Sequence, residues 1–150
     1  MDSNQLTSLF NSLTPAQQSE YMKRIAVAYE PEISPQVKEL FQQLAADHEI
    51  QMITDGTPEN CYAIGIGDSE TVHMDDDAKA RLQEIYVEMR ANSSKPIYLI
   101  HNHPYLDPSV ADTIPSPSDI YFFSRLPSGL IPAIYTNRTD TVLAYPFDTN

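Results

Sequence analysis

Short apolar runs separated by turn residues mark the strands that the sequence predicts. Ile50–Thr54 and Cys61–Ile66 flank Asp55-Gly56, a dipeptide typical of tight turns. Ile97–Ile100 carries no charge and is apolar apart from the hydroxyl of Tyr98, which is typical of a central buried strand. Further strands are expected at Thr71–Met74, Leu130–Thr136 and Thr141–Tyr145.

Helical spacing of apolar residues, with capping signals before it, predicts the helices. Thr14 followed by Pro15 is typical of a helix start and predicts a helix over Ala16–Glu30 that Pro31 ends. Ser34-Pro35 repeats the signal before an amphipathic segment that reaches about Asp47-His48. Two more helices are predicted over Ala78–Ala91 and Asp119–Leu126, and Gln5–Leu13 is either a short helix or a loose arm.

This order of elements predicts one mixed sheet. Helices alternate with strands and some strands are linked as hairpins, which favours an α/β (α+β) fold with a mixed central sheet flanked by helices. A chain of 150 residues is the size of one domain. We expect residues 1–33 to form an N-terminal helical extension and residues 34–150 to form the main domain.

Charge and composition narrow the class of protein. The net charge is −12, and the nine lysines and arginines are scattered, so binding to nucleic acid is disfavoured. No apolar run is long enough for a membrane span, and the N-terminus lacks the pattern of a signal peptide. Cys61 is the single cysteine, which excludes an intrachain disulfide. These features favour a cytoplasmic protein that contacts no membrane.

A pair of histidines follows the predicted central strand directly. His101 and His103 stand two residues apart, so their side chains share one face if the strand extends through them. Two imidazoles and one carboxylate form a three-ligand zinc site with an open position, the arrangement of catalytic zinc. Asp119, at the start of a predicted helix, is the candidate third ligand. A hydrogen-bonded surface pair of histidines is the simpler alternative for the motif alone.

The motifs resemble those of the JAMM metalloprotease family, also called the JAB or MPN-plus domain. The sequence His101-Asn102-His103-Pro104 is similar in particular to the bacterial RadC branch, and a Ser-x-x-Asp motif follows it. The resemblance extends from about Ser34 to the C-terminus. It implies a JAMM or cytidine-deaminase-like fold in which the two histidines and an aspartate bind zinc, a serine holds the water and the intermediate, and an upstream glutamate is the general base.

The glutamate of this pattern has two candidates. Glu49 directly precedes Ile50, and Gly56 follows as a turn glycine, which matches the order of the family. Glu59 precedes the strand at Cys61, but this choice leaves too little chain for two further strands before the next helix. Glu49 is preferred and Glu59 remains the alternative.

The Ser-x-x-Asp step also fits twice. Ser109 with Asp112 leaves five residues after His103, Ser116 with Asp119 leaves twelve, and the usual family spacing falls between them. We prefer the second pair, because an amphipathic segment follows Asp119 whereas Thr113-Ile114-Pro115 follows Asp112 and cannot continue as a helix. Tyr105 and Leu106, in the loop between the motifs, are candidates for substrate contact.

The resemblance implies a zinc-dependent hydrolase of peptide or isopeptide bonds, with a protein or peptide substrate such as a ubiquitin-like modifier cleaved after its C-terminal glycine. Two other functions stay open. One is a catalytically weak JAB-fold binding or scaffold module, and the other is a RadC-like protein of different activity.

Overall fold

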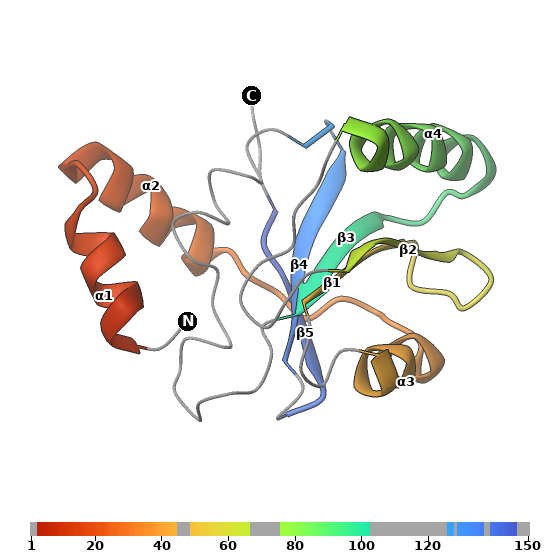
Figure 1. Ribbon diagram of the computed structural model, residues 1–150, viewed down its shortest axis with the longest axis horizontal. Coiled ribbons are helices and arrows are strands. Elements are labelled where there is room, and N and C mark those ends of the chain that lie inside the picture. The colour runs from red at the N-terminus through yellow and green to blue at the C-terminus, as the bar shows by residue number, and fades with distance from the viewer. Residues whose placement is uncertain are drawn as a thin grey trace.

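The fold was analysed in a computed structural model that describes residues 3–44, 49–66, 76–102, 126–127, 129–136 and 139–146. The predicted strand at 71–74 and residues 119–125 of the last predicted helix lie outside these ranges. The described part is an α+β protein with a five-stranded mixed sheet and helices (Figure 1). None of its helices combines the length and hydrophobicity that a membrane span requires.

The sheet has the strand order β2-β1-β3-β4-β5. Its strands are β1 (Ile50–Thr54), β2 (Cys61–Ile66), β3 (Ile97–Asn102), β4 (Leu130–Thr136) and β5 (Thr141–Ala144). β1 is antiparallel to both of its neighbours, β3 and β4 are parallel, and β5 is antiparallel to β4. The first residue of β1 therefore lies at the same end of the sheet as the last residues of β3 and β4.

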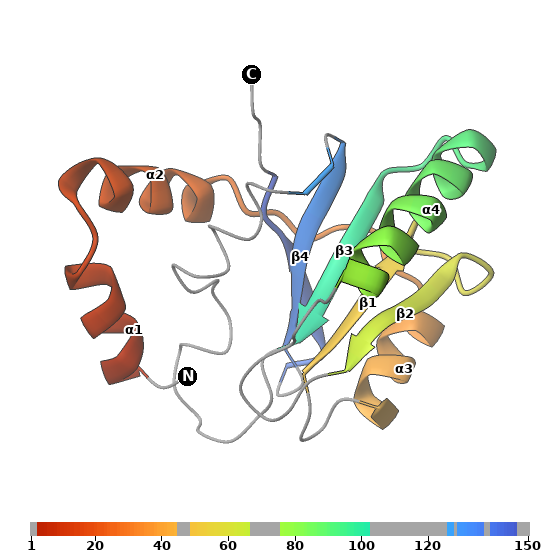
Figure 2. The same ribbon diagram turned by 45° about the horizontal axis from the view of Figure 1, so that its top comes forward.

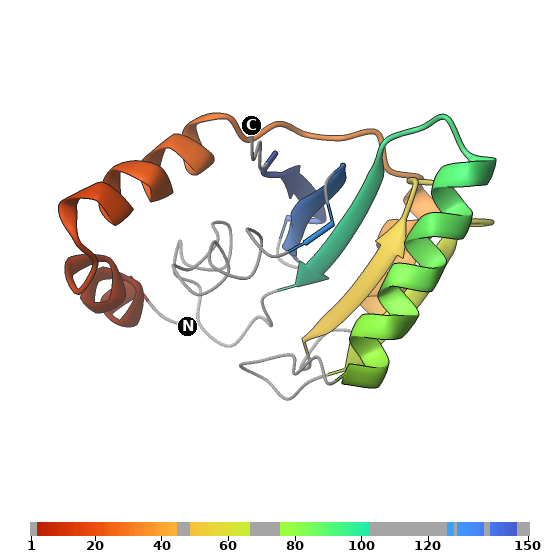
Figure 3. The same ribbon diagram turned by 90° about the horizontal axis from the view of Figure 1, so that it is seen from above.

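Helices pack on both faces of the sheet, α3 (Pro35–Leu44) on one and α4 (Asp76–Asn92) on the other (Figure 3). Phe41 of α3 packs with Ile50 and Ile100, whereas Leu82 of α4 packs with Ile53 and Leu99. These sets alternate along β1 and β3, as the pleat of a strand requires. We call the side of the sheet that carries Ile53 and Leu99 the α4 face. Because side chains alternate along a strand, Gln51 and His101 belong to the same face.

The N-terminal helices are α1 (Ser3–Asn11) and α2 (Pro15–Ala26), which lie beyond the β4–β5 side of the sheet (Figure 2). Thr14 caps α2 as predicted, with its hydroxyl accepting from the backbone N–H of Gln17. The prediction that this helix runs to Glu30 is wrong. It ends at Ala26 because Tyr29 adopts an extended conformation and exchanges two backbone hydrogen bonds with Ala144.

The predicted strands agree closely with those observed. β1, β2 and β4 have the predicted bounds, and β5 ends one residue earlier than expected. The prediction that the central strand ends at Ile100 is wrong, because β3 continues through His101 and Asn102. Backbone pairing of these residues with Gln51 and Tyr135 outweighs their polarity. α4 begins two residues before the predicted Ala78, with Asp76 and Asp77 in its first turn.

Candidate metal centre

Buried polar side chains gather at the end of the sheet where β3 and β4 finish and β1 begins. Five of the seven buried polar residues that the structure describes lie there, and two lie at the other end. The carboxyl ends of parallel strands are a common place for ligand sites in sheets with helices on both faces. The five residues at this end are Glu49, Gln51, His101, Asn102 and Thr136.

Of the two histidines in the predicted motif, the structure describes His101, the fifth residue of β3. It belongs to β3, is 4% exposed, and lies between Gln51 of β1 and Ile134 of β4 in the register of the sheet. A histidine held on a central strand has a fixed backbone, which favours a defined ligand geometry. His103 lies outside the described residues.

Asn102 ties the end of β3 to the start of β1. Its side-chain oxygen Oδ1 accepts a hydrogen bond from the backbone N–H of Ile50 at 2.7 Å, and the asparagine is fully buried. A buried bond of this kind is costly to lose because the N–H would be left without a partner. The bond therefore fixes the backbone next to Glu49 relative to the residue that follows His101.

Glu49 and Glu59, the two candidates for the general base, lie at opposite ends of β1. Glu49 directly precedes β1, is 6% exposed, and lies at the end that carries His101. Glu59 is exposed in the connection between β1 and β2, beyond the pair Thr54 and Cys61. The structure therefore brings Glu49, and not Glu59, to the histidine motif.

Gln51 occupies the position directly opposite His101 on the neighbouring strand. It is 6% exposed, and its side-chain oxygen Oε1 accepts no hydrogen bond within the described part of the chain. The register between β1 and β2 shifts opposite Gln51 and Met52, where Ile64 is the extra residue of a β-bulge on β2. Bulges are common beside functional sites, where they redirect a side chain.

The described donor set is compatible with a metal ion but covers only part of the predicted site. His101 offers a ring nitrogen as a ligand, and Glu49 and Gln51 bring a carboxylate and an amide oxygen to the same end of the sheet. Nitrogen and oxygen ligands of this kind suit zinc. Among the residues that the structure describes, no three His, Cys, Asp or Glu side chains converge on a common point.

The remaining predicted site residues cannot be compared with the fold. The predicted ligand Asp119, the predicted Ser116, and the proposed substrate contacts Tyr105 and Leu106 lie outside the described ranges. The alternative pair, Ser109 and Asp112, lies outside them as well. The choice between the two Ser-x-x-Asp motifs therefore stays a prediction.

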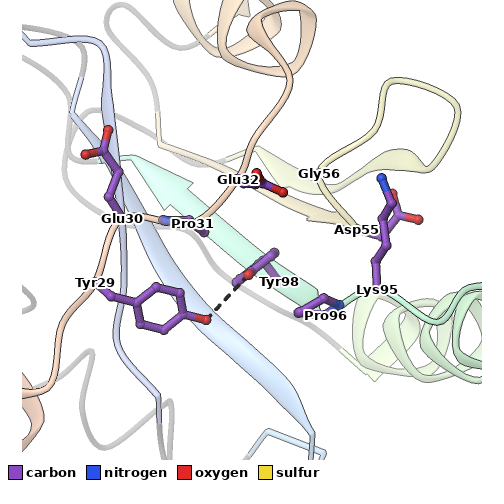
Figure 4. Close-up of a pocket in the computed structure, with 9 residues that line it drawn as sticks. All are labelled: Tyr29, Glu30, Pro31, Glu32, Asp55, Gly56, Lys95, Pro96 and Tyr98. Atoms are coloured by element: carbon purple, nitrogen blue, oxygen red, sulfur yellow. Dashed lines mark hydrogen bonds between the residues drawn. The ribbon is translucent and has the colours of Figure 1, made fainter.

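A hollow of about 370 Å³ lies at the opposite end of the sheet, away from the histidine (Figure 4). It is formed by the connection between α2 and α3, the turn after β1 and the start of β3. The hydroxyls of Tyr29 and Tyr98 meet there at 3.4 Å. Burial and the contact with Tyr29 raise the pKa of Tyr98, so its hydroxyl stays protonated.

Asp55, beside this hollow, is surrounded by local donors. Its carboxylate accepts hydrogen bonds from the backbone and hydroxyl of Thr57, from the amide of Asn60 and from the hydroxyl of Ser93. Burial alone would raise the pKa of Asp55, but these bonds outweigh it and lower the pKa below the ordinary value. Its hydrogen-bonding capacity is therefore largely used within the fold.

Comparison with known proteins adds no identity: no family model, no curated protein and no solved structure matches the chain.

Sequence reasoning overlooked three buried polar residues of this end, Gln51, Asn102 and Thr136. A signal was present for the first, because Gln51 is the one polar interior position of the apolar run Ile50–Ile53. Asn102 was read only as part of the family motif, although a buried asparagine after a central strand needs a hydrogen-bond partner. Thr136 gave no signal, since threonine is common in strands.

Proposed function

We propose that this protein is a zinc-dependent hydrolase of the JAMM type that cleaves peptide or isopeptide bonds. The substrate is a protein or peptide, and the bond after the C-terminal glycine of a ubiquitin-like modifier is one candidate target. The observation that carries the proposal is that the buried carboxylate of Glu49 and the buried imidazole of His101 lie at the same end of the sheet.

The other ligands of the proposed site come from the sequence. His103 stands two residues after His101, and Asp119 completes the set of two histidines and one carboxylate. Zinc in such a site supplies Lewis acidity toward a water molecule and toward the scissile carbonyl.

Each remaining step is assigned to a residue of the chain. Glu49 accepts a proton from the attacking water and donates it to the leaving amine, so it acts first as general base and then as general acid. The low exposure of Glu49 raises the strength of its electrostatic interactions with neighbouring charges. Ser116 donates a hydrogen bond to the oxyanion that develops on the carbonyl.

Metal analysis combined with cleavage assays tests the proposal. The purified wild-type protein is expected to hold one zinc ion per chain and to cleave at least one member of a panel of glycine-terminated modifier fusions. His101→Ala should lose both properties, because it removes a ligand from a central strand position. His73→Ala removes a histidine outside the motif and is the control, expected to keep both.

Two results would overturn this function. A wild-type protein that binds no zinc when metal is supplied in excess would favour the binding or scaffold module instead. Equal zinc content and equal hydrolysis in wild type and His101→Ala would exclude His101 as a ligand.

A further inference from the structure

Gln51 is a buried glutamine whose amide oxygen has no donor among the residues that the structure describes. The large majority of buried polar side-chain atoms have a hydrogen-bond partner, so an exception needs an explanation. The side chain is 6% exposed, and its Oε1 has no hydrogen-bond partner within the described residues. Replacing it by an apolar residue would remove this cost, so the fold alone gives no reason for a glutamine here.

The neighbours of Gln51 indicate what the oxygen is for. Gln51 and His101 are directly paired on adjacent antiparallel strands, and both side chains belong to the α4 face of the sheet. Side chains paired in this way have Cβ atoms about 4.5–5.5 Å apart, within reach of a glutamine and an imidazole. Asn102, next along β3, points to the other face, where its oxygen is engaged by Ile50.

A histidine that binds a metal through one ring nitrogen carries a proton on the other. That N–H is almost always donated to an oxygen, which fixes the ring orientation and the protonation state of the metal-binding nitrogen. An acceptor is therefore needed beside His101 whenever it serves as a ligand.

We propose that Gln51 is the positioning residue for His101. When a divalent metal is bound, Oε1 of Gln51 accepts the hydrogen bond from the ring N–H that faces away from the metal. This inference rests on the proposed zinc site and adds to it a residue that the family motifs do not contain. On the side that faces β3, β1 pairs without irregularity from Gln51 opposite His101 to Thr54 opposite Tyr98, so the glutamine is held in regular register beside the histidine.

The test measures metal affinity, with Zn²⁺ as the probe, by competition with a chromophoric chelator. Gln51→Leu removes the acceptor and keeps a side chain of similar volume, and it is expected to bind Zn²⁺ about 10–100-fold more weakly than wild type. Gln51→Glu retains an oxygen at the same position and should recover most of the affinity. Gln83→Leu makes the same exchange at an exposed position of α4 and should bind Zn²⁺ as wild type does.

Two further measurements separate positioning from folding. Without metal, Gln51→Leu should unfold at the same temperature as wild type or higher, because the unpaired oxygen is gone. With Co²⁺ in place of Zn²⁺, its visible absorption bands should shift, since the orientation of a ligating ring changes. Lower affinity together with undiminished metal-free stability assigns the glutamine to the metal site.

The possible failures are distinguishable. Wild-type affinity in Gln51→Leu, with His101→Ala unable to bind, would overturn the role of Gln51 and leave the zinc site intact. A wild-type protein that binds no Zn²⁺ would overturn the zinc site and the positioning role together.

Discussion

Asp55 and Gln51 are buried polar residues of the same strand region, one at each end of β1, and their surroundings differ. Asp55 accepts hydrogen bonds from Thr57, Asn60 and Ser93, so its carboxylate is fully engaged in holding the turn together. Gln51 has an oxygen for which the described residues offer no donor. The described residues thus account for the buried polar group at one end and leave one buried acceptor without a donor at the other.

The two ends of the sheet also differ in the chemical groups that they present to a ligand. The hollow is lined in part by the hydroxyls of Tyr29 and Tyr98, which already contact each other. The end that carries His101 buries a carboxylate and an imidazole at the finish of two parallel strands. The proposed zinc site therefore rests on the chemistry of the buried groups and not on the size of a hollow.

The contrast between the two ends of β1 is tested most directly by replacing each of the two candidate glutamates with glutamine. Glu49→Gln should lower hydrolysis by about 10²–10⁴-fold, because a general base contributes on that scale, while zinc content stays near wild type. Glu59→Gln makes the same exchange at the exposed far end and should change neither property. Rates on a cleaved fusion and zinc content are measured for both variants.

The opposite result, with Glu59→Gln inactive and Glu49→Gln active, would show that Glu59 is the general base and would overturn the role of Glu49. Equal activity in both variants would mean that neither glutamate transfers the proton.

A second prediction concerns the bond that joins β3 to β1. Asn102→Ala removes the acceptor of the Ile50 N–H and should lower the free energy of unfolding by about 2–3 kcal/mol, because a buried donor loses its partner. It should also weaken Zn²⁺ binding, since Glu49 and His101 are then held less firmly. Denaturant unfolding and metal titration measure the two effects.

Asn60→Ala is the matched change at the other end, where the amide donates to Asp55 at 3.0 Å in a half-buried turn. We expect it to cost about 1 kcal/mol or less and to leave Zn²⁺ binding unchanged. If both asparagine variants weakened Zn²⁺ binding equally, the two ends would not be independent.

Much of the sheet could be predicted from the sequence because its determinants are local. The apolar run Ile50–Thr54 and the Asp55-Gly56 turn define β1 and its end, and the structure confirms both. Gly56 has φ +91°, and a side chain on it would meet the backbone oxygen of Glu32 at 2.6 Å. A glycine is required there, as the turn signal indicated.

What could not be predicted depends on contacts between distant segments. The early end of α2 reflects the pairing of Tyr29 with Ala144, more than a hundred residues away. The bond from Ser93 to Asp55 joins residues 38 positions apart, so no local pattern indicates that Asp55 is saturated. The extension of β3 through His101 follows from its pairing with Gln51.

The candidate site, like the sheet, could be predicted only in part. His101 and Glu49 carried signals in the order of elements, and the fold brings them to one end of the sheet. Gln51 needed the register between β1 and β3, because only direct pairing with His101 gives its amide a use.

The smallest expected effect concerns Asp55, whose engagement by the fold should be visible as a dependence of stability on pH. Its pKa is lower in the folded chain than in the unfolded chain, so the stability it contributes is present above the unfolded pKa of about 3.9 and is lost as the pH falls toward the folded value. Asp55→Asn should therefore lower the free energy of unfolding by about 1–2 kcal/mol at pH 7, since Asn60 and Ser93 lose a charged acceptor. The difference from wild type should shrink below pH 4, as urea unfolding at a series of pH values would record. Zn²⁺ affinity at pH 7 should be the same in both proteins, and a loss of affinity in Asp55→Asn would mean that the far end of β1 also serves the metal site.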